Sequence, residues 1–195
     1  SAARKRLGLP DCLTILSAGG SQGASRINDA VVHLLSYEQK KGNINHIHGY
    51  GKHGKDTFMQ SLAENGVDPD NEHFIIKEYI DNMYTCMCAS DLIITRAGAM
   101  TLTELMAIGR ASILIPYPYA AENHQYYNAL TLQNANAGRI IDDKELTGAV
   151  LIDTVTKLTD DPELLKLMSE NAAKLSKHDA AGVILREITD LMGLE

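Results

Sequence analysis

Short apolar runs alternate with amphipathic stretches along the whole chain. Where apolar residues recur with helical spacing, as at Ile27, Val31 and Leu34, a helix is predicted. Short, mostly apolar runs predict strands at 13–17, 44–48, 74–80, 92–95, 112–115 and 139–141. Helices are predicted at 23–37, 57–65, 82–89, 100–108, 123–134, 144–158, 162–176 and 180–191. This alternation is typical of a parallel sheet covered on both faces. We therefore expect one doubly wound α/β domain of about six strands with a helical C-terminal tail.

The composition is that of an ordinary globular domain. The chain has 195 residues, of which 45% are hydrophobic and 22% charged, so it can bury a core of its own. No apolar run reaches the roughly 18–20 residues that cross a bilayer. Three cysteines are too few for a disulfide framework, so a cytoplasmic setting is expected. The formal net charge of −7 argues against a broad nucleic-acid surface.

A glycine-rich turn follows the first predicted strand and is the first candidate site. Gly19, Gly20 and Gly23 allow backbone N–H groups to approach a ligand, and the start of the next helix favours an anion. The spacing departs from the G-x-G-x-x-G pattern of dinucleotide-binding proteins, and His48 stands where that pattern expects an acidic residue. A dinucleotide site is therefore poorly supported, and a plain strand-to-helix turn is the alternative.

The segment 49–55 (GYGKHGK) matches the G-x-x-x-x-G-K pattern of a phosphate-binding loop. Asp56 stands where that pattern needs Ser or Thr to hold Mg²⁺, and a carboxylate there would repel phosphates. The segment also follows the second predicted strand rather than the first. We therefore interpret it as a polar surface loop.

The segment 96–104 (RAGAMTLTE) follows the fourth predicted strand. Gly98 allows a sharp turn, and Thr101 and Glu104 have the spacing of a capping box, so a well-capped helix is one interpretation. The functional interpretation, which we favour, uses free N–H groups and the Thr101 hydroxyl to hold a pyrophosphate. Glu104 would then accept hydrogen bonds from ribose hydroxyls, and Arg96 would supply a local cation.

The segment 116–128 (PYPYAAENHQYYN) follows the fifth predicted strand and combines four tyrosines with amide side chains and a histidine. Such groups offer donors and acceptors on flat surfaces, which suits the recognition of sugar hydroxyls. The alternative is a proline-fixed turn before a half-buried helix, with Tyr126 and Tyr127 in the core. We expect His124 and Gln125, at the start of this helix, to face a ligand.

Other reactive side chains point to structure rather than to chemistry. Cys86 and Cys88 lack a second pair, so no metal site is expected. His46 and His48 share one face of the second strand and are interpreted as structural or solvent-facing. The sequence has no G-x-S-x-G nucleophile signature, which disfavours a covalent hydrolase.

Four segments together resemble the C-terminal half of the MurG family of glycosyltransferases, and the similarity covers essentially the whole chain. The segments are 19–28, 79–83, 91–104 and 115–129. The resemblance implies one Rossmann-like half of a two-domain GT-B enzyme of peptidoglycan synthesis, active in cell wall biogenesis, cell shape and cell division. Residues 1–195 would be the domain that binds UDP-N-acetylglucosamine. The domain that binds the acceptor lipid I, and that meets the inner face of the bacterial cytoplasmic membrane, would lie outside the chain.

The resemblance also implies roles for single residues. Ser21 would face the phosphates, the backbone of Ile80 would bind uracil, and Glu104 would bind the ribose. Gln125 would read the sugar hydroxyls beside His124, which stands where some family members carry an amide. The implied donor-binding residues are Ser21, Ile80, Ala99, Met100, Thr101, Leu102, Thr103, Glu104 and Gln125, with Gly20, Arg96, His124 and Asn128 as additional candidates.

The implied reaction displaces UDP from the anomeric carbon with inversion. This chain would stabilise the departing pyrophosphate through a helix start, Ser21 and Arg96. The base would come from the missing half, so the chain is expected to hold no catalytic residue and to transfer nothing alone. No Asp-x-Asp element ends a strand, so neither an obligatory metal nor another cofactor is expected. Two alternatives stay open: a nucleotide-sugar-binding subunit that needs a partner chain, and a UDP-sugar epimerase of the same architecture.

Overall fold

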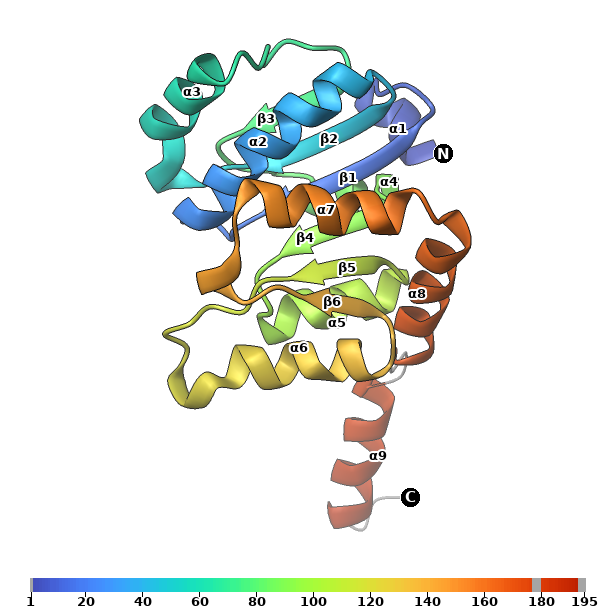
Figure 1. Cartoon of the computed structure of the whole chain (residues 1–195). Helices are drawn as coiled ribbons and strands as arrows, with labels where there is room; N and C mark the ends of the chain where they lie inside the picture. The colour runs from blue at the N-terminus through green and yellow to red at the C-terminus, as the bar shows by residue number, and fades with distance from the viewer. Residues whose placement is uncertain (1, 177–179, 193–195) are drawn as a thin grey trace.

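The computed structural model describes residues 2–176 and 180–192, and within these ranges six parallel strands form a sheet with the order β3-β2-β1-β4-β5-β6 (Figure 1). The strands are β1 (Leu13–Ala18), β2 (Ile44–Gly49), β3 (Phe74–Lys77), β4 (Leu92–Thr95), β5 (Ala111–Leu114) and β6 (Gly138–Ile140). Ala18 pairs with Gly49 on one side and with Thr95 on the other, so the carboxyl ends of the three central strands lie at one level. The strand order reverses between β1 and β4, which is the position where sheets of this kind bind ligands.

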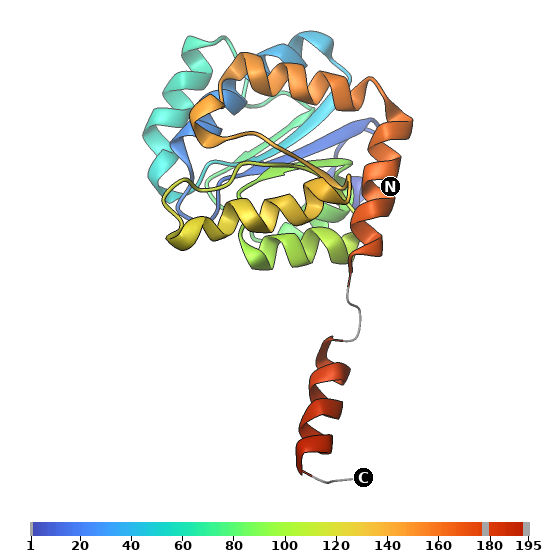
Figure 2. The ribbon, with the colours of Figure 1, turned by 60° about the horizontal axis from the view of Figure 1, so that its bottom comes forward.

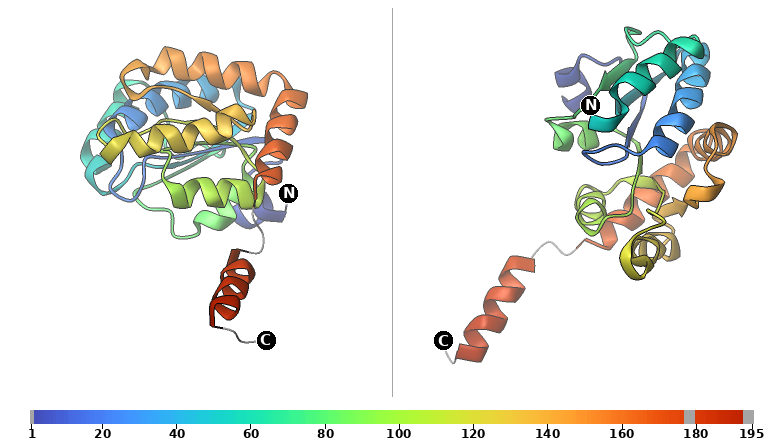
Figure 3. Two further views of the ribbon diagram at one scale, coloured as in Figure 1. Left: turned by 90° about the horizontal axis from the view of Figure 1, so that it is seen from below. Right: turned by 90° about the vertical axis from the view of Figure 1, so that its left-hand side faces the viewer.

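Helices cover both faces of the sheet. Successive strand residues such as Ile15 and Leu16 belong to separate hydrophobic clusters, because side chains alternate between the two faces of a strand. One cluster includes α2 (Ser25–Lys41), α3 (Lys55–Glu64) and α7 (Gly148–Thr159), and the other includes α4 (Met83–Ala89), α5 (Ala99–Ile108) and α6 (His124–Asn134). The helix α8 (Pro162–Lys174) contributes to both, and α1 (Ala2–Leu7) packs beside α4. This layering is visible in Figures 2 and 3.

The helix α9 (Ala180–Met192) stands apart from the layered body (Figure 2). None of the helices that the structure describes is long and apolar enough to cross a membrane. The remaining elements are three short 3₁₀ turns within the described ranges: η1 (Lys52–Gly54), η2 (Ala121–Asn123) and η3 (Asp143–Glu145).

The predicted doubly wound α/β sheet and its strands are confirmed, and the differences lie at element ends. The run 74–80 leaves the sheet after Lys77, since its last residues form the turn toward α4. The helix predicted at 144–158 begins only at Gly148, because the Thr147 side chain caps it by accepting the Val150 N–H at 3.2 Å. Gly42, in the left-handed region at φ 67°, ends α2 later than predicted. The helix α1 was not predicted.

The interpretation of 49–55 as a surface loop is wrong for its glycines, which are buried. A Cβ on Gly51 would lie 2.1 Å from the Gly23 nitrogen, and a Cβ on Gly23 would lie 2.3 Å from the Tyr50 oxygen. The two loops therefore meet backbone to backbone, and the Lys52 N–H donates to the Ser21 oxygen at 3.2 Å. The loop after β2 thus supports the glycine-rich turn after β1.

A buried chain of hydrogen bonds joins α2 to the neighbouring strands β1 and β2. His46 Nδ1 lies 2.7 Å from Glu38 Oε2, and Ser17 Oγ lies 2.7 Å from both His46 Nε2 and His48 Nδ1. All four residues are at most 1% exposed. Burial raises the pKa of Glu38 and holds the pKa of His48 well below its usual value. His46 and His48 are therefore structural, one of the two roles expected, and no substrate reaches this Ser–His–Glu arrangement.

Candidate functional site

A cavity of about 560 Å³ lies beyond the carboxyl ends of β1, β4 and β5. The three turns that the sequence singled out meet around it, because the ends of parallel strands share one edge of the sheet. Among the residues that the structure describes, those that line the cavity are Gly19, Gly20, Gln22, Gly23, Ala24, Ser25, Thr95, Arg96, Gly98, Thr101, Tyr117 and Gln125. The wall combines backbone from glycine turns with hydroxyl, amide and guanidinium groups, and no carboxylate is among these residues.

The turn after β1 forms one side of the cavity. Gly20 and Gly23 have φ values of 95° and 86°, and the Gly23 N–H donates to the Gly20 oxygen at 3.0 Å. Residues with a Cβ rarely adopt such conformations, so the tight turn depends on glycine. Ser21 is exposed between two lining residues, and α2 begins directly after the turn without a side-chain cap on Ala24. A helix start of this kind offers N–H groups to an anion.

The start of α5 forms the facing side. The capping box that the spacing of Thr101 and Glu104 allowed as an alternative does not form, because the helix begins at Ala99 and places Thr101 inside the first turn. Gly98 is the N-cap and provides no side-chain hydrogen bond, so the N–H groups of Ala99, Met100 and Thr101 have no partner within the helix. Met100 is 75% exposed at this helix start. The α5 N-terminus thus presents uncapped donors and the positive end of a helix dipole at the cavity.

The predicted residues that follow in α5 differ in what they can offer. Leu102 is buried, and its N–H donates to the Gly98 oxygen at 3.0 Å. The Thr103 hydroxyl donates to the Ala99 oxygen at 3.0 Å, within the helix. Glu104 is exposed and lies three residues beyond Thr101, on the same side of the helix. Of these three residues, Glu104 is the one with an exposed side chain that has no role in holding the helix, although it does not line the cavity itself.

Arg96 lines the cavity, but neighbouring groups hold its guanidinium. We call this guanidinium, the Asp143 carboxylate and the backbone oxygens of Ile115 and Pro116 the Arg96 clamp. Arg96 Nη1 donates to the Ile115 oxygen at 3.2 Å, to the Pro116 oxygen at 3.3 Å and to Asp143 Oδ1 at 2.5 Å. Its guanidinium carbon lies 5.6 Å from the centre of the Tyr117 ring. The charge expected to face a ligand is therefore largely matched by the Asp143 carboxylate.

The segment after β5 is held by its own amide side chains. Gln125 Oε1 accepts the Tyr117 N–H at 2.9 Å, and Asn128 Nδ2 donates to the Ala97 oxygen at 3.3 Å. His124 is exposed, and its Nδ1 lies 2.9 Å from the Ala121 oxygen. The alternative that places Tyr127 in the core is wrong, since this side chain is 64% exposed. Tyr126 is half-buried.

The family assignment follows from comparison with known proteins. The profile of the glycosyltransferase family 28 C-terminal domain matches residues 14–184. The chain belongs to this family. A relative from Desulforamulus reducens, the UDP-N-acetylglucosamine–N-acetylmuramyl-(pentapeptide) pyrophosphoryl-undecaprenol N-acetylglucosamine transferase, is 39% identical over 183 residues. The match covers 93% of this chain and 49% of the relative, so the chain spans about half the length of the curated relatives it matches.

Solved structures agree with this assignment to family 28. The crystal structure of Acinetobacter baumannii MurG has a TM-score of 0.80 and 29% identity, over 92% of this chain and 52% of that one. A Listeria monocytogenes protein described as a UDP-N-acetylglucosamine 2-epimerase has a TM-score of 0.73 and 14% identity, over 98% of this chain and 47% of that one. The second likeness concerns the fold alone. The resemblance predicted from the four sequence segments is confirmed.

The family 28 domain brings only part of the expected donor-binding set onto the cavity. Gly20, Arg96, Thr101 and Gln125 line it. Ile80 does not: it follows β3, at the edge of the sheet, and its buried side chain packs against the position of Gly49. The expected role of Ile80 rests on its backbone, which no side-chain pattern could reveal. Gln22 and Ser25 also line the cavity and were not predicted as site residues, although Gln22 directly precedes Gly23 and Ser25 begins the helix that follows it.

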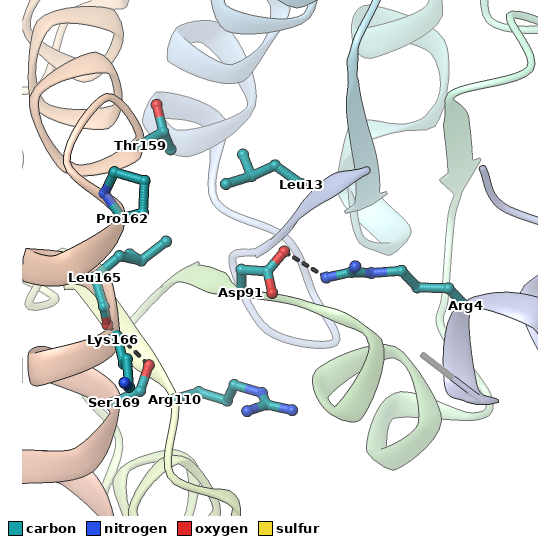
Figure 4. A pocket seen from close by; sticks show the side chains of 9 residues that line it. All are labelled: Arg4, Leu13, Asp91, Arg110, Thr159, Pro162, Leu165, Lys166 and Ser169. Carbon is teal, nitrogen blue, oxygen red and sulfur yellow. Dashed lines mark hydrogen bonds and ion pairs between the residues drawn. The ribbon is translucent and has the colours of Figure 1, made fainter. Parts of the chain in front are cut away.

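A second cavity, of about 350 Å³, lies at the other end of the strands, near the amino ends of β1, β4 and β5 (Figure 4). Arg4 reaches into it from α1 and pairs with Asp91 at 2.5 Å. Arg110 Nη2 donates to the Cys88 oxygen at 3.0 Å, near the end of α4. These side chains bind α1 and α4 to the sheet, so we interpret this cavity as structural. In the described part of the chain no group of three or more His, Cys, Asp or Glu residues could hold a metal ion.

Proposed function

We propose that this chain is the donor-binding half of an inverting glycosyltransferase that moves N-acetylglucosamine from UDP-N-acetylglucosamine to lipid I and so forms lipid II. The observation that carries the proposal is the uncapped start of α5 on the cavity at the reversal of strand order. Membership of family 28 and the transferase activity for which the Desulforamulus reducens relative is named support it. The net charge of −7 offers no broad attraction for an anionic donor, so local N–H groups must hold it.

The pyrophosphate of the donor would lie between the two helix starts. The N–H groups of Ala99, Met100 and Thr101 would face it from α5, and Ser21 and Gly20 would face it from the turn after β1. Glu104 would accept hydrogen bonds from the ribose, and the backbone of Ile80 would bind uracil. Gln125 would read the sugar hydroxyls, with His124 and Asn128 beside it.

The chemistry of this half would be electrostatic. When an acceptor hydroxyl attacks the anomeric carbon, the bond to UDP breaks and negative charge builds up on the leaving pyrophosphate. Fixed N–H groups at a helix start stabilise such charge without having to reorganise. The base that takes the acceptor proton would belong to the other half of the enzyme, and we propose that no metal or further cofactor is needed.

We also propose that the remaining half of such an enzyme binds lipid I at the inner face of the bacterial cytoplasmic membrane. The fragment alone would then bind donor weakly and transfer nothing. A nucleotide-sugar-binding subunit with a separate partner chain would differ in one observable: a partner that restores transfer. A UDP-sugar epimerase is less well supported, since it needs carboxylates on the cavity and none lines it among the described residues.

Calorimetric titration of the chain with UDP-N-acetylglucosamine, UDP-glucose and NADH tests the proposal directly. We expect binding of UDP-N-acetylglucosamine and weaker binding of UDP-glucose, because the site reads the acetamido sugar. Tight binding of NADH without binding of either UDP-sugar would overturn the proposal.

Replacing Glu104 by alanine is expected to weaken UDP binding by about 1–3 kcal/mol, because the ribose hydroxyls lose their acceptor. The side chain is exposed, so the variant should keep the stability of the parent chain. Thermal unfolding and titration with UDP check both statements. Glu170, an exposed carboxylate on α8, provides the matched control as Glu170→Ala. Equal UDP affinity in the two variants would remove Glu104 from the site.

A further inference from the structure

The segment after β5 is poorly supported by packing, although it carries one wall of the cavity. Glu122 and Asn123 are exposed and have φ values of 51° and 55°, which side chains with a Cβ rarely adopt. A separate cavity of about 350 Å³ is lined by residues of the segment, among them Pro116 and Tyr126, and on its other side by residues that include Asp143. Apolar contacts alone therefore do not fix the position of this segment.

Polar contacts fix it instead, and they converge on one carboxylate. Asp143, in η3, accepts from Arg96 at Oδ1, and its Oδ2 lies 3.3 Å from Arg26 Nε on α2. The Arg96 side chain is 15% exposed and the Asp143 side chain 9%. The Arg96 guanidinium also donates to two backbone oxygens at the end of β5 and lies over the Tyr117 ring.

The contacts continue from this clamp to the residue that would read the sugar. Tyr117, against which Arg96 packs, donates its N–H to Gln125 Oε1 at 2.9 Å. A shift of Arg96 would therefore move Tyr117 and change the position of the Gln125 amide. Removal of one partner from a buried ion pair leaves an uncompensated charge, which drives such a shift.

We propose that Asp143 is a positioning residue for recognition of the donor sugar, acting through Arg96 and Tyr117 on Gln125. This inference rests on the proposed function, because it assumes that Gln125 contacts the sugar of a UDP-sugar. Asp143 does not line the donor cavity and so does not touch the ligand itself. We expect its effect on the sugar and not on the nucleotide, since Tyr117 and Gln125 belong to the wall after β5, whereas the turn after β1 and the start of α5 would hold the pyrophosphate.

The test compares UDP with UDP-N-acetylglucosamine as ligands of the full 195-residue chain. In Asp143→Ala we expect roughly tenfold weaker binding of UDP-N-acetylglucosamine, equivalent to the loss of one well-placed hydrogen bond, while UDP binds as before. Asp143→Asn keeps the shape of the side chain and one acceptor oxygen. It should therefore fold, and its affinity for UDP-N-acetylglucosamine should fall less than that of Asp143→Ala. Asp153→Ala, which removes an exposed ion pair with Lys157 on α7, is the matched control.

The outcomes separate the inference from the proposed function. If the parent chain binds neither UDP nor the UDP-sugar, the proposed function fails. If the parent chain binds both, and a folded Asp143→Ala variant also binds both with unchanged affinity, the inference fails; where Asp143→Ala does not fold, unchanged affinity of Asp143→Asn for both ligands has the same meaning. A parallel loss of UDP and UDP-sugar binding also overturns it, because a general structural defect would produce that result.

Discussion

Replacing Glu38 by alanine is expected to lower the free energy of unfolding by about 3–5 kcal/mol, the typical cost of breaking a buried polar pair from one side. The substitution removes the carboxylate oxygen that lies 2.7 Å from His46 Nδ1. Because His46 is fully buried, water cannot replace this partner. For a domain of this size the melting temperature should fall by roughly 6–20 °C. Urea and thermal unfolding of the parent chain and the variant measure the change.

Glu38→Gln is the informative companion, because its amide oxygen can still accept a hydrogen bond from His46. We expect it to lose clearly less stability than Glu38→Ala. Asp153→Ala, which removes an exposed ion pair, should change the free energy of unfolding by at most about 1 kcal/mol. If Glu38→Ala unfolds at the same urea concentration as the parent, the buried chain of hydrogen bonds contributes little to stability.

This buried chain illustrates what the sequence could and could not predict about the fold. The alternation of side chains along β2 correctly places His46 and His48 on one face. Their partners, Glu38 on α2 and Ser17 on β1, come from other elements, and periodicity carries no information on such pairing. The choice between buried and solvent-facing histidines therefore needed the packed structure.

The candidate site shows the same limits of prediction from sequence. The three turns that form it are unusual in composition and were singled out, because glycines and clustered amides are rare within regular elements. The helix predicted at 100–108 begins one residue earlier, at Ala99, so the capping box that Thr101 and Glu104 suggested by their spacing does not mark the helix start. The salt bridge between Arg96 and Asp143 joins residues 47 positions apart, so no local pattern could reveal that this cation is already matched.

Because α5 begins at Ala99, a substitution at this residue can test whether the helix start binds a ligand. Proline is tolerated at the first position of a helix, where the N–H has no partner within the helix. Gly98 has φ −66° and ψ 143°, a conformation that suits the residue before a proline. Ala99→Pro should therefore fold normally, while it deletes one of the N–H groups that would face the pyrophosphate.

Ala99→Pro is expected to weaken binding of both UDP and UDP-N-acetylglucosamine by about 1.5–3 kcal/mol, or roughly 10- to 150-fold, because a hydrogen bond to a charged group is lost. The two ligands should lose equally, since they share the pyrophosphate, and this separates the variant from Asp143→Ala. Ala99→Ser keeps the N–H and should bind as the parent does. Titration calorimetry gives the affinities, and circular dichroism confirms the helix content. If Ala99→Pro folds and binds UDP with unchanged affinity, the proposed position of the pyrophosphate at α5 is wrong. The uncapped start of α2 across the cavity would then be the candidate.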